Sequence, residues 1–411
     1  MSSKRKPVDP EKEKRKIKSV QQMKKIMKKY YWRAKTAKYF RKKVAWITSG
    51  GPVEQLIALD VIPVYPENHG AMIGASKMGV DLCQVSEDMG YSRDLCSYVR
   101  SDIGSSATKG GPIGGLPKPD FLVCCNNICG TVLKWYEIQA RKYNVPLFIF
   151  DTPFIHTEFS AEAKKYVQRQ MREYIQFLET VCKKKMNQNR MQEVGLLAIR
   201  AQKLWQQILD CPAHKPAPMT AFDAFFHLAL IVTLRGTQTV VDYYEQLLAE
   251  MKQRNADGIS MVPNEKYRFL WDNLPIWYRV RWLSEKFSSH NACLVADTYT
   301  SAWSGVVHLL DENNLLDTMA VAYSSVHLNV SIDLMFEKIA AMVEKYDVDG
   351  IIMHSNRSCK PYSFGQYDLQ KRIMKELNLP TLILEADMVD ERNFSESQIE
   401  TRIDAFMETF K

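Results

Sequence analysis

The stretch FLVCCNNICGTVLKWYEIQARKYNVPLFIFD, residues 121–151, determines the fold class that we expect for this chain. Its start, "FLVCC", is typical of a strand, and "GTVLKWYEIQARKYN" is typical of a helix. The end, "VPLFIFD", is typical of a second strand. A strand, a helix and a strand in succession predict a parallel βαβ unit. The same stretch places three cysteines within six residues, where the first strand ends.

The alternation continues on both sides of this stretch. Before it, "KKVAWITSGG" and "IPVYPEN" are typical of strands, with the helix "PVEQLIALDV" between them. In the second half, "ACLVADTY", "MAVAYSS", "DGIIMHS" and "PTLILEAD" are predicted strands. Apolar residues recur at helical spacing from about residue 160 to 250. We therefore predict an α/β fold of two Rossmann-like lobes with parallel sheets, an intervening helical segment and an active-site cleft between the lobes.

The change of pattern also sets the segment boundaries that we predict. They are a basic N-terminal helical arm over residues 1–43, a first α/β lobe over 44–159, a mainly helical segment over 160–290 and a second α/β lobe over 291–411. No sequence repeat relates the two lobes.

Composition places the chain among soluble globular proteins. It has 411 residues, of which 46% are hydrophobic and 25% charged. No apolar stretch approaches the ~20 residues of a membrane helix, and the charged N-terminus lacks the apolar segment of a secretory signal. We therefore expect a cytoplasmic protein with no membrane partner. Disulfides are rare there, so the nine cysteines are expected to be free thiols, packing residues or metal ligands.

The net charge of +8 is unevenly distributed along the chain. Residues 1–43 contain 18 Lys and Arg against three acidic residues, whereas the remainder contains 37 basic and 44 acidic residues. Such an arm could bind an acidic protein, the phosphates of a large cofactor or nucleic acid. A solvated and partly frayed leading helix is the plainer interpretation, although "KKYYWRAKTAKYF" has aromatic spacing that would dock an amphipathic helix on the body. We expect no nucleic-acid partner.

Reactive side chains follow the predicted strands in both lobes. They are Ser49, Glu67, Cys124, Cys125, Cys129 and Cys359. Open parallel sheets bind ligands outside the carboxyl ends of their strands, so a cleft between the lobes could gather these side chains into one site. Cys96 lies at a predicted helix start, where the peptide dipole favours a thiolate.

Several thiolates in one cleft would suit an iron–sulfur cluster or zinc. The paired CxxC spacing usual for zinc is absent, and the cysteine spacings match no compact ferredoxin pattern. Buried packing cysteines are an equally simple interpretation. Three thiolates and a carboxylate would leave an iron incompletely held by sulfur, and open metal positions accept substrates in catalysis.

Four motifs carry a resemblance to a known family. "YPENHGA", "DLCSYVRSDIG", "FLVCCNNIC…LKWYE" and "HSNRSCK" resemble motifs of the cluster-bearing subunits of the 2-hydroxyacyl-CoA dehydratase family, which includes the ATP-dependent benzoyl-CoA reductases. The similarity runs from about residue 42 to the closing "ETRIDAFMETF" and leaves only the arm outside. The ordered set is more specific than any one motif.

The resemblance implies a [4Fe–4S] cluster, or a larger fused iron–sulfur cluster, and a CoA thioester as substrate. The implied ligands are Cys96, Cys129 and Cys359, with Cys125 as the alternative to Cys129. Glu67 matches a carboxylate beside the open iron, and Ser49 matches a hydroxyl near the substrate.

The resemblance also implies a reaction and its partners. The hydrogen lost from a 2-hydroxyacyl thioester lies β to the carbonyl and is not acidic, so simple elimination has too high a barrier. In this family a separate ATP-hydrolysing iron–sulfur activator supplies an electron, and the resulting ketyl radical anion expels the hydroxyl group. We therefore expect an (R)-2-hydroxyacyl-CoA dehydratase subunit with a related second cluster-bearing subunit. The alternatives are a benzoyl-CoA reductase subunit and a non-catalytic electron-relay subunit.

Other features have plain interpretations. "GGPIGGLPKP" lacks the Gly-Lys-Ser/Thr ending of a phosphate loop, so we expect a turn there and ATP bound by the activator instead. Arg235 could meet a CoA phosphate, or equally lie at an exposed helix end. His69 and His354 stand near the proposed site, and we expect structural hydrogen-bonding roles for both.

Overall fold

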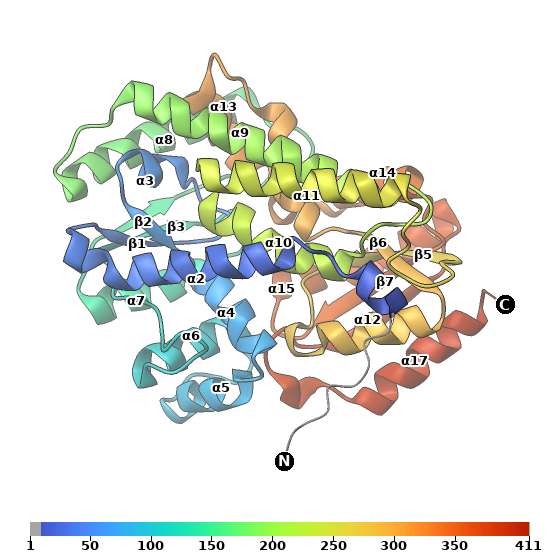
Figure 1. Ribbon diagram of the computed structural model, residues 1–411. Coiled ribbons are helices and arrows are strands. Elements are labelled where there is room, and N and C mark those ends of the chain that lie inside the picture. Colours follow the sequence, from blue (N-terminus) through green and yellow to red (C-terminus); the bar gives the residue numbers. More distant parts are fainter. Residues whose placement is uncertain (1–9, 411) are drawn as a thin grey trace.

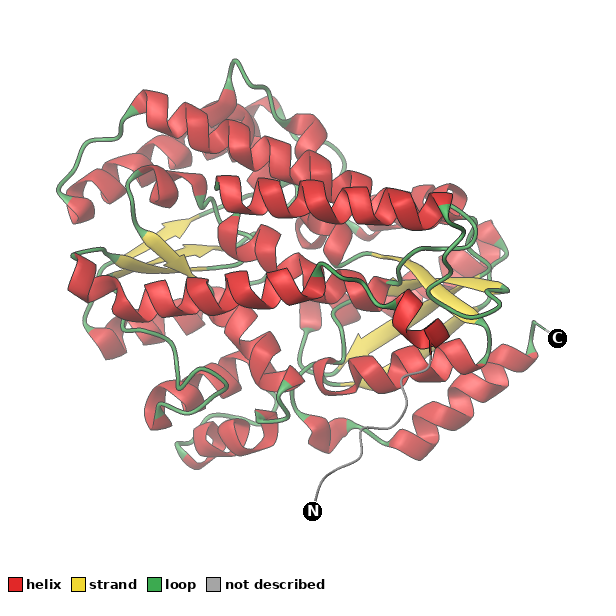
Figure 2. Ribbon diagram, in the orientation of Figure 1, coloured by secondary structure: helices red, strands yellow, loops and turns green. Residues whose placement is uncertain are grey.

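Two separate parallel sheets form the centre of the molecule. The computed structural model describes residues 10–410, and Figures 1 and 2 show the two sheets with helices packed around both. The first sheet contains, in spatial order, β2 (Ile62–Val64), β1 (Val44–Ile47), β3 (Phe121–Cys125) and β4 (Leu147–Phe150). The second contains β6 (Ala292–Asp297), β5 (Tyr267–Asp272), β7 (Gly350–Asn356) and β8 (Thr381–Ala386). All neighbouring strands are parallel, which confirms the predicted α/β class.

Both sheets have the same topology. In each lobe the strands are ordered second, first, third, fourth, so the lobes share a structural repeat that the sequence did not reveal. Right-handed crossovers place helices on opposite faces of such a sheet, and a crevice opens where the strand order reverses. That point lies between β1 and β3 in the first lobe and between β5 and β7 in the second.

Helices surround the sheets and fill the space between them (Figure 1). The arm contains α1 (Pro10–Arg15) and α2 (Val20–Thr36), and the first lobe contains α3 (Glu54–Ala58), α4 (Pro66–Ala75), α5 (Gly79–Asp88), α6 (Ser97–Thr108) and α7 (Thr131–Tyr143). The helical segment contains α8 (Ala161–Cys182), α9 (Gln188–Asp210), α10 (Ala221–Leu234) and α11 (Gln238–Ala256). The second lobe contains α12 (Val280–Ser289), α13 (Leu315–Ser324), α14 (Ile332–Tyr346), α15 (Lys360–Ser363), α16 (Gln366–Arg372) and α17 (Glu396–Glu408). In the described part of the chain, no helix is both long and apolar enough to cross a membrane.

In the second half, one strand was not predicted from the sequence and one predicted strand was wrong. β5 is a central strand, although it falls inside the segment predicted to be mainly helical. Its apolar run is interrupted by Arg268, a buried residue whose guanidinium pairs with Glu265 and donates to the carbonyl of Tyr346. The stretch "MAVAYSS", predicted as a strand, lies largely in α13, which buries Leu315, Met319 and Ala322 at helical spacing.

The basic arm is docked on the body. Tyr30 and Tyr31 of α2 are buried, and the Tyr30 hydroxyl donates to the carbonyl of Pro63 at 2.8 Å. The start of α2 is held by Glu250 of α11, whose carboxylate accepts the backbone N–H groups of Lys18 (2.6 Å) and Ser19 (3.0 Å). The aromatic spacing therefore predicted the docking correctly, while the exposed lysines of α2 leave its outer face in solvent.

Glu250 satisfies N–H groups that have no partner inside α2, as a capping side chain does. We expect Glu250→Ala to lower the free energy of unfolding by about 1–2 kcal/mol, measured by chemical denaturation. Glu245→Ala, on the same helix, removes only an exposed pair with Arg200 and should cost less than about 0.5 kcal/mol. Equal losses in the two variants would contradict a capping role.

A buried ionic network joins the lobes. Arg100 of α6 donates to Glu87 of α5 at 2.6 Å and to Asp390 of the second lobe at 2.8 Å. Arg392 donates to the same two carboxylates, at 2.6 and 2.7 Å. Burial alone would raise the pKa of Asp390, but the hydrogen bonds from Arg392 and Arg100 lower it to about 2.

Breaking this network should destabilise the protein strongly, because Arg100 would keep its buried charge with one partner fewer. We expect Asp390→Asn to lower the free energy of unfolding at pH 7 by about 3 kcal/mol. The difference from wild type should shrink as the pH falls from about 4 towards 2, where Asp390 itself becomes protonated. Glu385→Gln, which removes an exposed pair with Arg357, is the control and should cost less than about 1 kcal/mol.

Candidate active site between the lobes

One cavity between the lobes gathers five of the predicted site residues. It has a volume of about 140 Å³. The five residues are Ser49, Glu67, Cys96, Cys129 and Cys359. Ser49 follows β1, Cys129 follows β3 and Cys359 follows β7. The cavity therefore lies at the crevice where both sheets reverse their strand order, as expected for open parallel sheets.

Each of the three cysteines lies next to the start of a helix. Cys96 immediately precedes α6, Cys359 immediately precedes α15, and Cys129 lies two residues before α7. All three are partly buried. Cys125, by contrast, is fully buried inside β3, where its backbone N–H donates to the Thr48 hydroxyl, and it does not line the cavity. Of the two alternatives, the structure brings Cys129 to the other thiols.

Burial keeps these thiols protonated in the absence of a cation. It raises the pKa of Cys96, and the charges of Cys359 and Cys129 raise it further. It also raises the pKa of Cys359 to about 12, despite an opposing hydrogen bond from the backbone N–H of Tyr362. The backbone N–H groups of Val99 and Tyr98 at the helix start lower the pKa of Cys96, as the peptide dipole predicts, but desolvation outweighs them.

This donor set fits an iron–sulfur cluster. Among the described residues, no three His, Cys, Asp or Glu side chains are grouped closely enough to hold a single metal ion. A cluster of several iron and sulfide ions is wider than one ion and takes thiols spaced around a cavity. Metal coordination deprotonates a thiol, and the backbone N–H groups at the helix starts favour the resulting negative charge.

Glu67, the second residue of α4, presents a buried carboxylate to the cavity. One oxygen accepts the backbone N–H of Ser49 at 3.1 Å and the other accepts the Tyr136 hydroxyl at 3.2 Å. Burial raises the pKa of Glu67 to about 7, and these hydrogen bonds oppose the shift. A carboxyl group with this pKa can give or take a proton near neutral pH.

Hydrogen bonds fix the helices that follow the cysteines. Asp102 of α6 accepts the indole N–H of Trp135 (2.7 Å) and the amide of Gln139 (2.6 Å), both on α7. Between the lobes, the backbone N–H of Ser97 donates to the Ser358 hydroxyl at 3.1 Å. Ser97 and Ser358, the neighbours of Cys96 and Cys359, are therefore joined by a direct hydrogen bond.

The other predicted residues do not line this cavity. Arg235 is buried rather than at an exposed helix end. It pairs with Glu54 at 3.1 Å and donates to the Tyr323 hydroxyl at 2.9 Å. The ring of His354 is bonded to the carbonyl of Leu274, as expected for a structural role. His69 is fully buried and neither of its ring nitrogens has a partner among the described residues, so the expected hydrogen bond is absent there.

Sequence reasoning missed several residues that line the cavity. His327 and Trp303 come from short 3-10 helices of the second lobe, Tyr299 from the turn before one of them, and Tyr98 from α6. Burial lowers the pKa of His327 to about 3, which keeps its imidazole neutral. The one available signal was the aromatic residues in the polar stretch "DTYTSAWSG" after a strand.

Comparisons with known proteins identify the family of this chain. The family model of the 2-hydroxyglutaryl-CoA dehydratase D-component matches residues 48–410. The (R)-2-hydroxyisocaproyl-CoA dehydratase alpha subunit of Clostridioides difficile is 34% identical over 94% of both chains. The (R)-phenyllactyl-CoA dehydratase alpha subunit of Clostridium sporogenes is 35% identical over 90% of both chains. A benzoyl-CoA reductase subunit of Thauera aromatica is 27% identical over 89% of this chain and 88% of its own.

The match covers nearly all of the chain beyond the arm, and the four motifs that carried the resemblance lie within it. The chain therefore belongs to the 2-hydroxyacyl-CoA dehydratase family and is an enzyme of the dehydratase type.

Proposed function

We propose that this chain is the iron–sulfur subunit of an ATP-activated (R)-2-hydroxyacyl-CoA dehydratase. The observation that carries the proposal is the convergence of Cys96, Cys129 and Cys359 with Glu67 and Ser49 on one cavity. A cavity that presented only the three thiols would suit an electron relay. The added acid–base and hydrogen-bonding groups favour contact with a substrate.

Dehydration is favoured over ring reduction by the relatives. Dehydratase alpha subunits match this chain at 28–35% identity, and the reductase relative at 27%. All of these relatives are named as one subunit of a larger enzyme, which implies a partner subunit. We propose a related second cluster-bearing subunit and a separate ATP-hydrolysing iron–sulfur activator. The glycine-rich segment of this chain supports that division of labour, because Gly111, Gly114 and Gly115 form turns before β3 rather than a phosphate loop before a helix.

In this proposal, Cys96, Cys129 and Cys359 would hold a [4Fe–4S] or larger fused cluster, which when bound would lend an electron of low potential to the thioester and recover it once hydroxide and the β-proton have left. The Ser49 hydroxyl donates a hydrogen bond to the substrate. Glu67 accepts the β-proton once it has become acidic, and Ser49 N–H and Tyr136 hold its carboxylate in place. The mostly apolar walls, including Val132, Leu274 and Trp303, exclude water from reactive intermediates.

Replacing the three cysteines tests the cluster site. We expect Cys96→Ala, Cys129→Ala and Cys359→Ala each to remove most of the iron and acid-labile sulfide from anaerobically purified protein, because two thiols hold a cluster poorly. Cys182→Ala and Cys211→Ala, distant from the cavity, should keep full iron content. Cys125→Ala should also keep full iron content. If Cys125→Ala loses its iron and Cys129→Ala keeps it, Cys125 is the ligand instead of Cys129.

Replacing Glu67 separates catalysis from folding. Glu67→Gln keeps the size of the side chain and can bond to both Ser49 N–H and the Tyr136 hydroxyl, which can also accept. We expect iron content and melting temperature to be maintained while turnover falls by about 10²–10⁴-fold. Glu137→Gln, which removes a surface carboxylate of α7, is the control. Near-normal turnover of Glu67→Gln with a lower melting temperature would indicate a structural carboxylate instead.

A further inference from the structure

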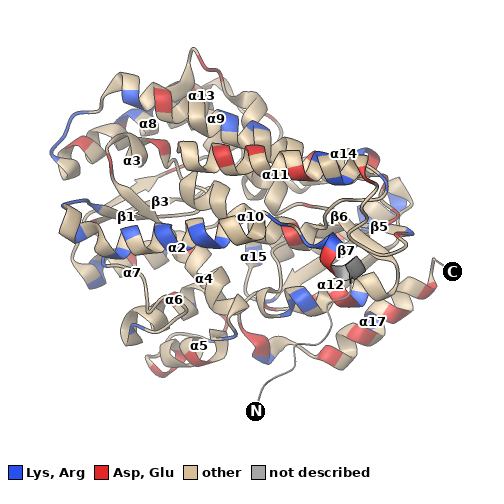
Figure 3. Ribbon diagram, viewed as in Figure 1, with Lys and Arg blue, Asp and Glu red and all other residues tan. Residues whose placement is uncertain are grey.

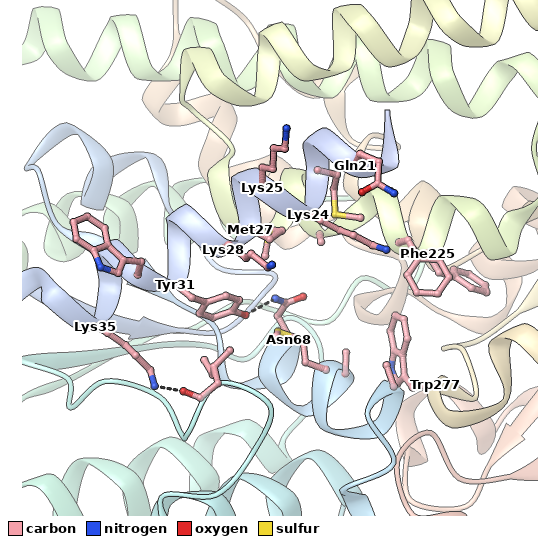
Figure 4. Close-up of a pocket in the computed structure, with 18 residues that line it drawn as sticks. Gln21, Lys24, Lys25, Met27, Lys28, Tyr31, Lys35, Asn68, Phe225 and Trp277 are labelled. Carbon is pink, nitrogen blue, oxygen red and sulfur yellow. Dashed lines mark hydrogen bonds between the residues drawn. The ribbon is translucent and has the colours of Figure 1, made fainter. Parts of the chain in front are cut away.

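A second and larger cavity lies on the other side of α4. We call it the α2 groove. Its volume is about 740 Å³, within the range of about 300–1,000 Å³ typical of ligand sites. Its walls come from α2, α4 and α10, with Ile113 and Trp277 (Figure 4). Glu67 and Asn68 are successive residues of α4, yet Glu67 lines the cysteine-lined cavity and Asn68 lines the α2 groove.

The α2 groove carries positive charge that the described chain does not neutralise. Lys24, Lys25 and Lys28 of α2 line it, and α2 contains no acidic residue (Figure 3). Across residues 10–410 as described, none of these three ammonium groups has an ion-pair or hydrogen-bond partner. A fourth, Lys35, donates to the carbonyl of Ile113 at the edge of the groove. Several such cations around one cavity favour a ligand with clustered negative charge, such as phosphates.

The lower part of the groove is aromatic. Tyr31, held by a hydrogen bond from Asn68 at 3.0 Å, faces Phe225 and Trp277 across the space shown in Figure 4. Trp32 and Phe226 line it too and are 57% and 46% exposed. Aromatic faces suit the stacking of a planar base. A groove with one part suited to a base and another suited to phosphates fits a phosphorylated nucleotide better than an inorganic anion.

One layer of aromatic side chains separates the α2 groove from the cysteine-lined cavity. Phe225 and Trp277 line the groove, whereas Tyr98 and Tyr299 line the cavity. The Trp277 indole N–H donates to the Tyr98 hydroxyl at 2.6 Å. The rings of Phe225, Trp277 and Tyr299 contact one another at centroid distances of 6.2–6.3 Å. These four aromatic side chains are therefore in contact across the boundary between the two cavities.

We propose that the α2 groove binds the phosphate-bearing adenosine end of the CoA thioester whose acyl end enters the cysteine-lined cavity. This inference rests on the proposed function. Lys24, Lys25 and Lys28 contact the phosphates, the aromatic residues contact the adenine, and the pantetheine arm passes through the aromatic layer. The basic arm is thus a part of the substrate site rather than a surface tail.

CoA binding to the whole enzyme, measured by calorimetry without turnover, tests this assignment. We expect the double variant Lys24→Gln/Lys28→Gln to bind CoA about 10–100-fold more weakly than wild type, because each lysine loses a charge-assisted bond to phosphate. Lys29→Gln is the matched control: it removes the same charge from the same helix but does not line the groove, and its Kd should stay within about twofold. An acyl-pantetheine thioester, which has no phosphates, should bind the double variant as it binds wild type.

Each other outcome has a definite meaning. Normal CoA affinity in the double variant, or an equal loss for the acyl-pantetheine thioester, overturns the proposal. If ATP binds the groove more tightly than CoA does, the groove is a site for a free nucleotide. If the double variant loses the partner subunit, the groove is a protein contact. Both results overturn the proposal. If CoA binding depends on the lysines but the enzyme does not dehydrate a 2-hydroxyacyl-CoA, only the proposed function is overturned.

Discussion

The buried pairing of Arg100 with Asp390 fixes how the two lobes meet. Arg100 projects from the helix that begins after Cys96, and Asp390 follows the last strand of the second lobe. Both side chains are removed from water, so each would be costly to leave unpaired. The position of Cys96 relative to Cys359 is set by this contact together with the bond between Ser97 and Ser358. A site made from both lobes depends on such rigid cross-links, because a cluster tolerates little variation in ligand spacing.

The cysteine-lined cavity illustrates how burial and metal chemistry oppose each other. Desolvation raises the pKa of each thiol, so the site favours neutral sulfur until a cation replaces the protons. In the proposed function, assembly of the cluster would therefore release protons. The same apolar surroundings that penalise a free thiolate would also exclude water from the proposed substrate.

Helix α4 organises both cavities. Its first turn presents Glu67 to the thiols, while Asn68, Ala71 and Met72 form a wall of the α2 groove. The close approach of its neighbours requires glycine: a Cβ at Gly70 would lie 2.5 Å from the Tyr98 ring, and one at Gly74 would lie 2.9 Å from Trp277 Cβ. These two glycines let the aromatic layer pack directly against the helix. The "YPENHGA" motif thus combines a reactive carboxylate with a packing surface.

The sequence alone determined the parallel α/β class, the positions of most strands and the residues that follow them. Hydrophobic runs and turn residues are local, so "FLVCC" and the helix after it could be identified without the fold. The motifs also identified the family. Only the tertiary structure decided that Cys129 rather than Cys125 meets the other thiols, because a strand hides Cys125 while the turn after it points Cys129 into the crevice. The burial of Arg235, the docking of α2 and the placement of His327 likewise depend on contacts between segments far apart in the chain. Such contacts leave no periodic signal in a single sequence, since they arise from how the two lobes and the helical segment pack together.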